Sequence, residues 1–474
     1  MNRRPNHALR HAFRTPLLAA ASALAILTAS PAFADCVPGN GGPRDYLCTG
    51  TFGLASNFGD ARTVALQGAN MNGLLGMSVA SGNIGFSMDA ASSIINTQSF
   101  FAIQKDGFIL STSNGTIDTN TPTGTGINGS ITSMYSWALV ARTTGANSNI
   151  NLALGSKSTL TGKLGGLAAR ADNNSSIGLT LGGKIYSSDG YGVYAQAVDG
   201  AVNIKVDGDV IAGGDGVDAV TTGKGAINIS GAGNIQSATG VGVNAQATGG
   251  GNISVNLTGN VSGPVGGIYA QSAGGDVTVN VTGNVTGGDG IIATTNGKGA
   301  ATVTTGPSKI TGLTGDGIDV LTMDGWGVVN VGTGGVTGKR SGVVAVAQGE
   351  GSVKVIVHGD VAGGTDYGVA GATNKGSIQI DLDAGKYISG GKAGVLLQTR
   401  SGEATLNNKG TVTATGSGAA VLVDAHDGSA TINNAGIMIG GPEGIAIGVA
   451  SGKALVNNPG VLNGQVLSNG VTTV

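Results

Sequence analysis

A sequence motif that recurs about every 25 residues constrains this chain more than any other feature. Each copy reads Gly-Val/Ile-x-Ala/Val, then a short polar turn, an alternating apolar run and a closing Gly. The copies begin at Gly166, Gly192, Gly216, Gly242, Gly267, Gly290, Gly317, Gly342, Gly368 and Gly394, at Ala420 in a degenerate copy, and at Gly444. A fixed period of this length is typical of a solenoid, because one repeat cannot bury its apolar face alone and must stack on its neighbours.

The alternating run of each repeat predicts a buried column of β-forming residues. Most copies carry an apolar residue four positions before the closing Gly: Ile204, Ile229, Val255, Val279, Val328, Val355, Leu406, Ile432 and Val456. Successive side chains of a strand point to opposite faces, so one such residue per repeat builds a continuous apolar ladder inside the coil. Thr302 and Asp381 break the column, and a one-residue slip that turns Ile380 inward would repair the second break.

Composition supports ordered β-structure. The 474 residues include 89 Gly, and only 11% are charged. Glycine-rich chains are often disordered, but these glycines recur at turn positions between β-branched residues. Each repeat has room for two or three short strands and none for a crossover helix, which favours parallel pairing. We therefore predict an all-β chain that forms a right-handed parallel β-helix with an irregular N-terminal cap.

The first 34 residues have the features of an export signal. A basic start is followed by an apolar stretch from Leu17 to Ser30 and by Ala32-Phe33-Ala34, which fits the small-x-small cleavage rule. We predict cleavage between Ala34 and Asp35. The stretch is shorter than the roughly 20 residues of a membrane span. The rest divides into an irregular β cap (35–136), a parallel β-helix (137–464) and a C-terminal tail (465–474).

Cys36 and Cys48 are the only two cysteines. In an oxidising exported compartment we expect them to form a disulfide that closes a short loop, since a metal site would need more ligands. Lipidation of Cys36 is the alternative, but Asp35 occupies the position where a small residue is wanted. Removal of the signal leaves 21 basic and 27 acidic residues, a net charge of -6. This balance argues against nucleic acid as a partner.

The densest group of carboxylates is Asp316, Asp319 and Asp324, with Asp215 and Asp218 four repeats earlier. Polysaccharide lyases and hydrolases on β-helices need clustered carboxylates, often with a basic residue. Adjacent aspartates and a Gly-His-Gly, which such enzymes carry, are missing from the sequence. We therefore interpret these carboxylates as surface residues and assign no catalytic residue.

Gly213–Thr221 matches a nonapeptide that binds calcium in parallel β-rolls, and Gly315–Leu321 matches part of it. That chemistry requires tandem copies, because each ion is shared between successive turns. These two copies are isolated, so we interpret their aspartates as residues that favour a tight bend and predict neither a metal nor a cofactor.

Paired asparagines occur in three successive repeats, as Asn407-Asn408, Asn433-Asn434 and Asn457-Asn458. Their spacing predicts amide ladders stacked at one turn of the coil, an arrangement that satisfies buried polar groups. A row of amides that binds sugar is the functional alternative.

Repeats such as Gly267–Gly288 resemble the passenger domains of autotransporters, the type V secretion proteins of Gram-negative bacteria. The resemblance implies export by the Sec machinery, display at the cell surface or outer membrane, or release, and commonly adhesion, aggregation or interaction with a host. Autotransporters end in a membrane β-barrel, whereas this sequence stops at Val474 just after the last repeat. The resemblance therefore implies a barrel translocator on another polypeptide, a truncated gene, or a periplasmic location if there is no translocator.

Two functions are compatible with these patterns. We expect an exported, non-enzymatic surface passenger that binds an unknown glycan or protein ligand through many weak contacts along its flank. The alternative is a secreted polysaccharide lyase or hydrolase that uses the face between Asp316 and Asp324.

Overall fold

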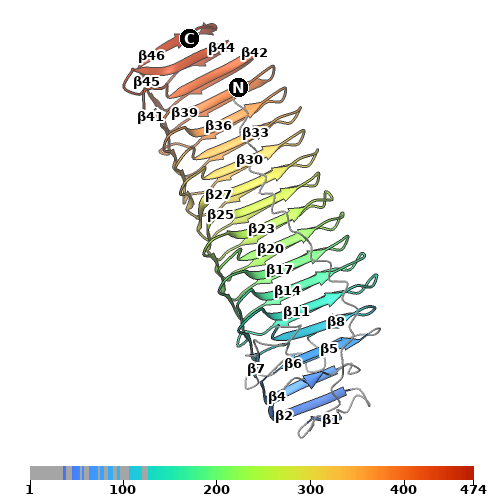
Figure 1. The fold of residues 1–474 in the computed structure, drawn as a ribbon. Coiled ribbons are helices and arrows are strands. Elements are labelled where there is room, and N and C mark those ends of the chain that lie inside the picture. Colours follow the sequence, from blue (N-terminus) through green and yellow to red (C-terminus); the bar gives the residue numbers. More distant parts are fainter. Residues whose placement is uncertain are drawn as a thin grey trace. The chain divides into compact units, whose positions relative to one another are not determined.

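The structure is a computed structural model that describes residues 36–38, 45–53, 56–57, 63–72, 75–79, 84–88, 93–96, 106–119 and 126–474. The predicted cleavage site between Ala34 and Asp35 lies outside these residues. All regular elements of the described part are β-strands that belong to one sheet. Successive coils stack with parallel strands (Figure 1), which confirms the predicted all-β parallel β-helix.

The coils have three faces, which we call A, B and C. Face A contains the Gly-Val/Ile-x-Ala/Val motif and consists of β3 (Ser56–Asn57), β5 (Leu75–Val79), β8 (Phe108–Thr112), β11 (Trp137–Thr143), β14 (Gly165–Ala171), β17 (Tyr191–Ala197), β20 (Val217–Thr221), β23 (Val241–Ala247), β25 (Val261–Ser272), β27 (Val285–Thr295), β30 (Ile318–Thr322), β33 (Val343–Ala347), β36 (Tyr367–Thr373), β39 (Ala393–Thr399), β42 (Val421–Asn434), β44 (Ile445–Asn457) and β46 (Gln465–Ser468).

Face B contains the alternating run. It consists of β6 (Ile84–Met88), β9 (Ile117–Asp118), β12 (Ile150–Leu154), β15 (Ile177–Leu181), β18 (Val202–Val206), β21 (Ile227–Gly231), β24 (Ile253–Leu257), β26 (Val277–Val281), β28 (Ala301–Thr305), β31 (Gly327–Val331), β34 (Val353–Val357), β37 (Ile378–Leu382), β40 (Glu403–Asn408), the second halves of β42 and β44, and β47 (Val471–Thr473).

Face C is built from the shortest strands. It consists of β7 (Ser93–Asn96), β10 (Ser130–Ser133), β13 (Thr159–Gly162), β16 (Lys184–Ser187), β19 (Val210–Ala212), β22 (Ile235–Ser237), the first parts of β25 and β27, β29 (Ile310–Gly312), β32 (Val336–Gly338), β35 (Val361–Gly363), β38 (Tyr387–Gly390), β41 (Thr411–Ala414), β43 (Ile437–Ile439) and β45 (Val461–Asn463). Two further strands, β2 (Asp45–Gly53) and β4 (Thr63–Asn72), lead into this stack.

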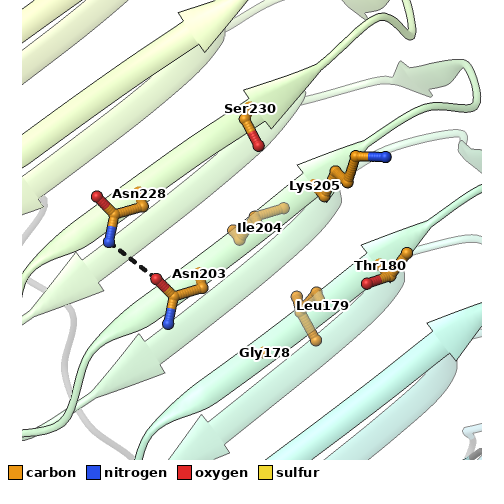
Figure 2. A pocket seen from close by; sticks show the side chains of 8 residues that line it. All are labelled: Gly178, Leu179, Thr180, Asn203, Ile204, Lys205, Asn228 and Ser230. Carbon is orange, nitrogen blue, oxygen red and sulfur yellow. Dashed lines mark hydrogen bonds between the residues drawn. The ribbon is translucent and has the colours of Figure 1, made fainter.

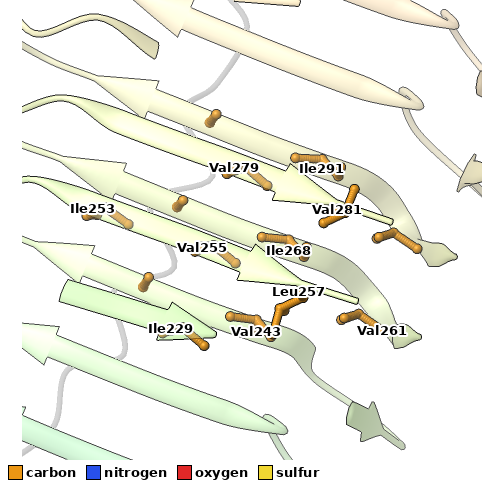
Figure 3. Packing of buried hydrophobic residues seen from close by; sticks show 14 of the residues in the cluster. Ile229, Val243, Ile253, Val255, Leu257, Val261, Ile268, Val279, Val281 and Ile291 are labelled. Carbon is orange, nitrogen blue, oxygen red and sulfur yellow. The ribbon is translucent and has the colours of Figure 1, made fainter. Parts of the chain in front are cut away.

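The inward side chains form one continuous apolar core from Cys48 to Val456. Figure 3 shows how the same apolar positions repeat from coil to coil, as with Val255 and Val279 on face B. Because strand side chains alternate, every second residue enters this core and its neighbours face outward. The burial pattern of β26, in which buried and half-buried residues alternate, is representative.

The register of the inward column on face B differs from the prediction at two positions. Val303 and Val329 are buried there, and the neighbouring Thr302 and Val328 face outward. The assignment of Val328 to the column was therefore wrong, because the closing Gly of these coils lies only three residues after the inward residue. The slip proposed for the next irregular coil is confirmed, since Ile380 is buried and Asp381 faces outward.

The motif glycines pack closely against the coil that follows. An added Cβ at Gly216 would lie 2.5 Å from the carbonyl oxygen of Gly242, so this close approach requires glycine. The last copy begins at Ala446, which follows Ala420 in the stack, and not at Gly444 as predicted. Gly444 instead lies in a turn with a φ of 69°.

Parallel coiling is not confined to residues 137–464. Phe108 of β8 pairs with Leu139 of β11, and Leu75 of β5 pairs with Phe108. These steps of 31 and 33 residues are longer than the 26 residues between Leu167 and Val193, which explains why the period was not recognisable there. At the other end, β46 and β47 pair with β44, so strands continue into the segment 465–474.

Strand β1 (Cys36–Pro38) pairs antiparallel with β2, and this register sets Cys36 opposite Cys48. Cys48 is disulfide-bonded and buried. Among the described residues, no helix has the length and apolar character needed to cross a membrane.

Candidate functional site

The aspartates that the sequence singles out on the later coils do not converge. Asp316 is buried at the corner between faces C and A, where Arg340 Nη2 lies 2.6 Å from its Oδ2 and the Ser341 amide donates to its Oδ1 at 3.0 Å. Asp319 lies in the outward column of face A. Asp324 is exposed in the next turn, where it accepts a hydrogen bond from the Glu350 amide at 3.3 Å. The buried carboxylate of Asp316 thus has a structural role at the corner.

Acidic side chains at the corner before face A accept hydrogen bonds from backbone amides of the following coil. Asp215 Oδ1 accepts from the Val241 amide at 2.7 Å, and Asp289 Oδ1 accepts from the Asp316 amide at 2.7 Å. Such bonds satisfy amides that leave the strand ladder at a bend. These contacts support the interpretation of the calcium-like segments as turns. Within the described residues, no group of three or more His, Cys, Asp or Glu side chains is arranged to hold a metal ion.

The paired asparagines form two ladders, which confirms their predicted stacking. The outward ladder runs from Asn407 through Asn433 to Asn457, with N···O distances of 2.8 Å. The inward ladder joins Asn408, Asn434 and Asn458, with distances of 2.7 Å. Asn408 and Asn434 are buried, and the hydrogen bond that Asn408 donates to Asn434 helps to make these amides tolerable in the core. The ladders lie at the end of the face B strands.

A shallow hollow of about 260 Å³ lies on the outer surface of face B, over β15, β18 and β21. It forms beside Gly178, which has no side chain in an outward column otherwise occupied by Asn203 and Asn228. Figure 2 shows the hydrogen bond between these two amides, 2.8 Å long, and Lys205 farther along its strand. The hollow is open and shallow, so it offers little enclosed contact to a ligand.

A cluster of aromatic rings and hydrogen-bonding side chains lies on the outer surface of face A. We call it the aromatic patch and define it by Trp137, Tyr191, Tyr194, Asp218 and Asn244. These residues belong to β11, β17, β20 and β23, which follow one another in the stack with β14 between the first two (Figure 1). The three rings are partly exposed.

The rings of the aromatic patch contact one another across the coils. The planes of Trp137 and Tyr191 differ by 7° and their centroids are 6.1 Å apart. Tyr194 is tilted against Tyr191 at 5.6 Å and against Trp137 at 6.4 Å. The intervening strand places Gly165 between Trp137 and Tyr191, where an added Cβ would lie 2.1 Å from Trp137 Cε3. Glycine at this position therefore leaves space for the indole.

The polar half of the aromatic patch is a short hydrogen-bonded chain. Gln246 Nε2 donates to Asn244 Oδ1 at 3.1 Å, and Asn244 Nδ2 donates to Asp218 Oδ1 at 3.0 Å. Asp218 faces outward but is only 6% exposed. Burial raises the pKa of its carboxyl group to about 7, repulsion by Asp215 adds to the rise, and the Asn244 bond opposes it.

The same burial and negative charge raise the pKa values of the two tyrosines. Burial raises the pKa of Tyr191 to about 12, and the negative charges of Asp218 and Asp215 contribute. Burial also raises the pKa of Tyr194, with Asp218 acting in the same direction and Arg170 in the opposite one. Both phenols therefore remain neutral donors at physiological pH, and Tyr194 donates to Gln196 Oε1 at 3.1 Å.

Sequence reasoning did not find the aromatic patch, although it noted Asp218. Trp137 and Tyr191 are far apart in the sequence and meet only through the coil register. Their position in the repeat could have revealed them. Trp137, Gly165 and Tyr191 each precede by one residue the motif position that is glycine in most copies. A comparison of that column across repeats would have aligned them.

Comparison of the chain with protein-family models, with curated proteins and with solved structures found no match.

Proposed function

We propose that this chain is an exported, non-enzymatic surface protein, a β-helical passenger of the autotransporter type, which attaches to other surfaces through its outer faces. The observation that carries the proposal is the aromatic patch, where partly exposed rings and amides gather on neighbouring coils. Aromatic residues with a polar group are typical of binding surfaces, because they combine apolar contact area with hydrogen bonding. Export rests on the signal segment and on the resemblance of the repeats to autotransporter passengers.

A non-enzymatic role agrees with the arrangement of the aspartates that the enzyme alternative requires. A general acid or nucleophile must reach its substrate. Asp316 is 1% exposed and its carboxylate is bound by Arg340, while Asp324 lies beyond the other end of β30. These side chains do not line a common open site.

An attachment assay tests the proposal. Beads coated with the purified chain should adhere to cells or polymer films more than beads coated with an unrelated β-rich protein of similar charge. The same preparation, incubated with neutral and acidic polysaccharides, should release no new reducing ends or unsaturated uronates. Equal adhesion of both bead types would refute the proposed attachment, and sugar release that is lost in Asp319→Asn would favour the enzyme.

Export has its own test. Expression in a Gram-negative host should yield a chain outside the cytoplasm whose first residue is Asp35, as read by mass spectrometry of the N-terminal peptide. A chain that stays in the cytoplasm and retains Met1 would contradict export by the Sec machinery.

A further inference from the structure

We propose that the aromatic patch binds a neutral polysaccharide, whose sugar rings lie on Trp137 and Tyr191 and whose hydroxyl groups bond to Asp218 and Asn244. The inference rests on the proposed function, since it names the ligand class for one of the attaching surfaces. Binding of an acidic polymer, and attachment without any binding of the hexasaccharides, are the outcomes that the test below distinguishes from it.

The ring geometry suits a sugar chain. The rings of Trp137 and Tyr191 are nearly parallel and partly exposed, and they lie across two steps of the stack. The flat C–H faces of pyranose rings pack on such surfaces, because the ring face carries negative charge density and the C–H bonds are weakly positive. The ring of Tyr194 is tilted against both and adds a third aromatic surface. A sugar chain can therefore contact more than one ring at once.

The polar side chains suit hydroxyl groups. Asn244 bonds only to Oδ1 of Asp218, and Oδ2 accepts no hydrogen bond from the residues that the structure describes. A carboxyl oxygen in a site with little exposure gains most from a ligand donor, since water reaches it poorly. Sugar hydroxyls both donate and accept, so they can bond to this oxygen and to the neighbouring amides. Because the pKa of this carboxyl group is near 7, it can donate a hydrogen bond when protonated or accept one when ionised.

The charges of the aromatic patch favour a neutral ligand. Asp215 and Asp218 already raise the pKa of Tyr191, which shows that their negative field reaches the rings. Uronates or phosphates placed on those rings would meet the same repulsion. The positive charge of Arg170 lowers the pKa of Tyr194, so it also reaches the rings, but its Nε lies 3.4 Å from Asp172 Oδ1. This partner carboxylate reduces what Arg170 can offer to an anion.

The dimensions of the aromatic patch also favour a polysaccharide over a folded protein. With strands about 4.8 Å apart, the four steps from β11 to β23 extend for about 19 Å, and the three residue steps from Tyr191 to Tyr194 cover about 10 Å. A stable protein interface needs roughly 800 Å² on each partner. A narrow strip of this size matches a few sugar units of one chain.

Tryptophan fluorescence tests the inference. The chain has two tryptophans, so Trp326→Phe leaves Trp137 as the only reporter. We expect its emission to change saturably with at least one of cellohexaose, laminarihexaose and maltohexaose, and not with polygalacturonate. Calorimetry should show that Trp137→Ala weakens binding of that hexasaccharide about tenfold, which corresponds to the loss of one ring contact.

Two further variants make the test specific. Gly165→Ala should weaken binding although it removes no contact group, because the new Cβ would lie 2.1 Å from Trp137 Cε3 and displace the indole. Trp326→Ala is the matched control, since Trp326 is 53% exposed but lies in the turn between β30 and β31, outside the aromatic patch. It should bind as the unchanged chain does. Circular dichroism verifies that each variant keeps its β-structure.

Each contrary result has a distinct meaning. Unchanged hexasaccharide binding in Trp137→Ala would overturn the assignment of the site. Preferential binding of polygalacturonate would overturn the neutral class. Failure of all three hexasaccharides, together with bead attachment that persists, would overturn this inference and leave the proposed function standing. If beads coated with the unchanged chain attach no better than the control beads, the proposed function itself is overturned.

Discussion

At the scale of single residues, Asp218 is the most unusual titratable group that the structure describes. Its side chain faces outward from β20, yet neighbouring coils cover it until only 6% is exposed. Because burial raises its pKa from 3.8 to about 7, folding favours the protonated form. The contribution of Asp218 to stability is therefore greatest below pH 4 and is lost progressively as the pH rises through about 7.

Asp218→Asn should remove this pH dependence. The amide still accepts a hydrogen bond from Asn244 but never ionises. The free energy of unfolding of the variant, relative to that of the unchanged chain, should therefore increase by about 3 kcal/mol between pH 5 and pH 8. Urea midpoints at the two pH values measure it. Asp189→Asn is the control, since this aspartate is 51% exposed and its ion pair with Lys163 spans 3.8 Å. Equal gains at both pH values would refute a raised pKa.

At the scale of strands and coils, the same residue type has two different roles on the two sides of face B. Asn433 belongs to the outward ladder and is partly exposed, whereas Asn434 belongs to the inward ladder and is fully buried. Asn434 accepts from Asn408 and donates to both Asn458 Oδ1 and the Val461 carbonyl oxygen. Water can replace the partners of the outward amide but not those of the inward one.

Asn434→Ala should therefore destabilise the chain far more than Asn433→Ala. We expect a loss of about 2 to 4 kcal/mol for the buried position, because the buried Asn408 amide loses the oxygen to which it donates, and about 0.5 to 1 kcal/mol for the outward one. Urea unfolding followed by circular dichroism compares the two variants. A similar loss in both would show that the inward ladder adds nothing beyond strand pairing.

The coil elements also show how far sequence reasoning can go. The period and the alternation predicted the parallel coils, because both follow directly from stacking and from the strand repeat of two. The exact register failed at Val328, since the loop before its closing Gly is one residue shorter, and a one-residue slip exchanges the two sides of a strand. The aromatic patch escaped prediction because Trp137 and Tyr191 become neighbours only once the register is fixed.

At the scale of the whole solenoid, the strands of each described coil pair only with strands of the coils before and after it. Val243 pairs with Val217 on one side and Ile268 on the other, and this pattern continues along face A. Stability is then close to a sum of coil terms and neighbour terms, and a coil can be removed without loss of the remaining core.

Deletion of residues 243–267 should give a folded chain, because it joins Gly242 to Ile268 in register with β20 and removes one whole coil. We expect a β-rich circular dichroism spectrum and a slightly smaller urea m-value, in proportion to the surface that is lost. Deletion of residues 243–254 should misfold, since about half a coil displaces every later strand. If both deletions misfold, the coils are not independent units.

The separation of inward from outward side chains has a practical consequence. Along a strand, outward positions recur about every 6.6 Å, and from coil to coil they recur about every 4.8 Å. Substitutions at these points leave the buried columns untouched. The exterior of the described coils is thus a regular grid of positions, on which rows of chosen chemical groups could be arrayed at molecular pitch.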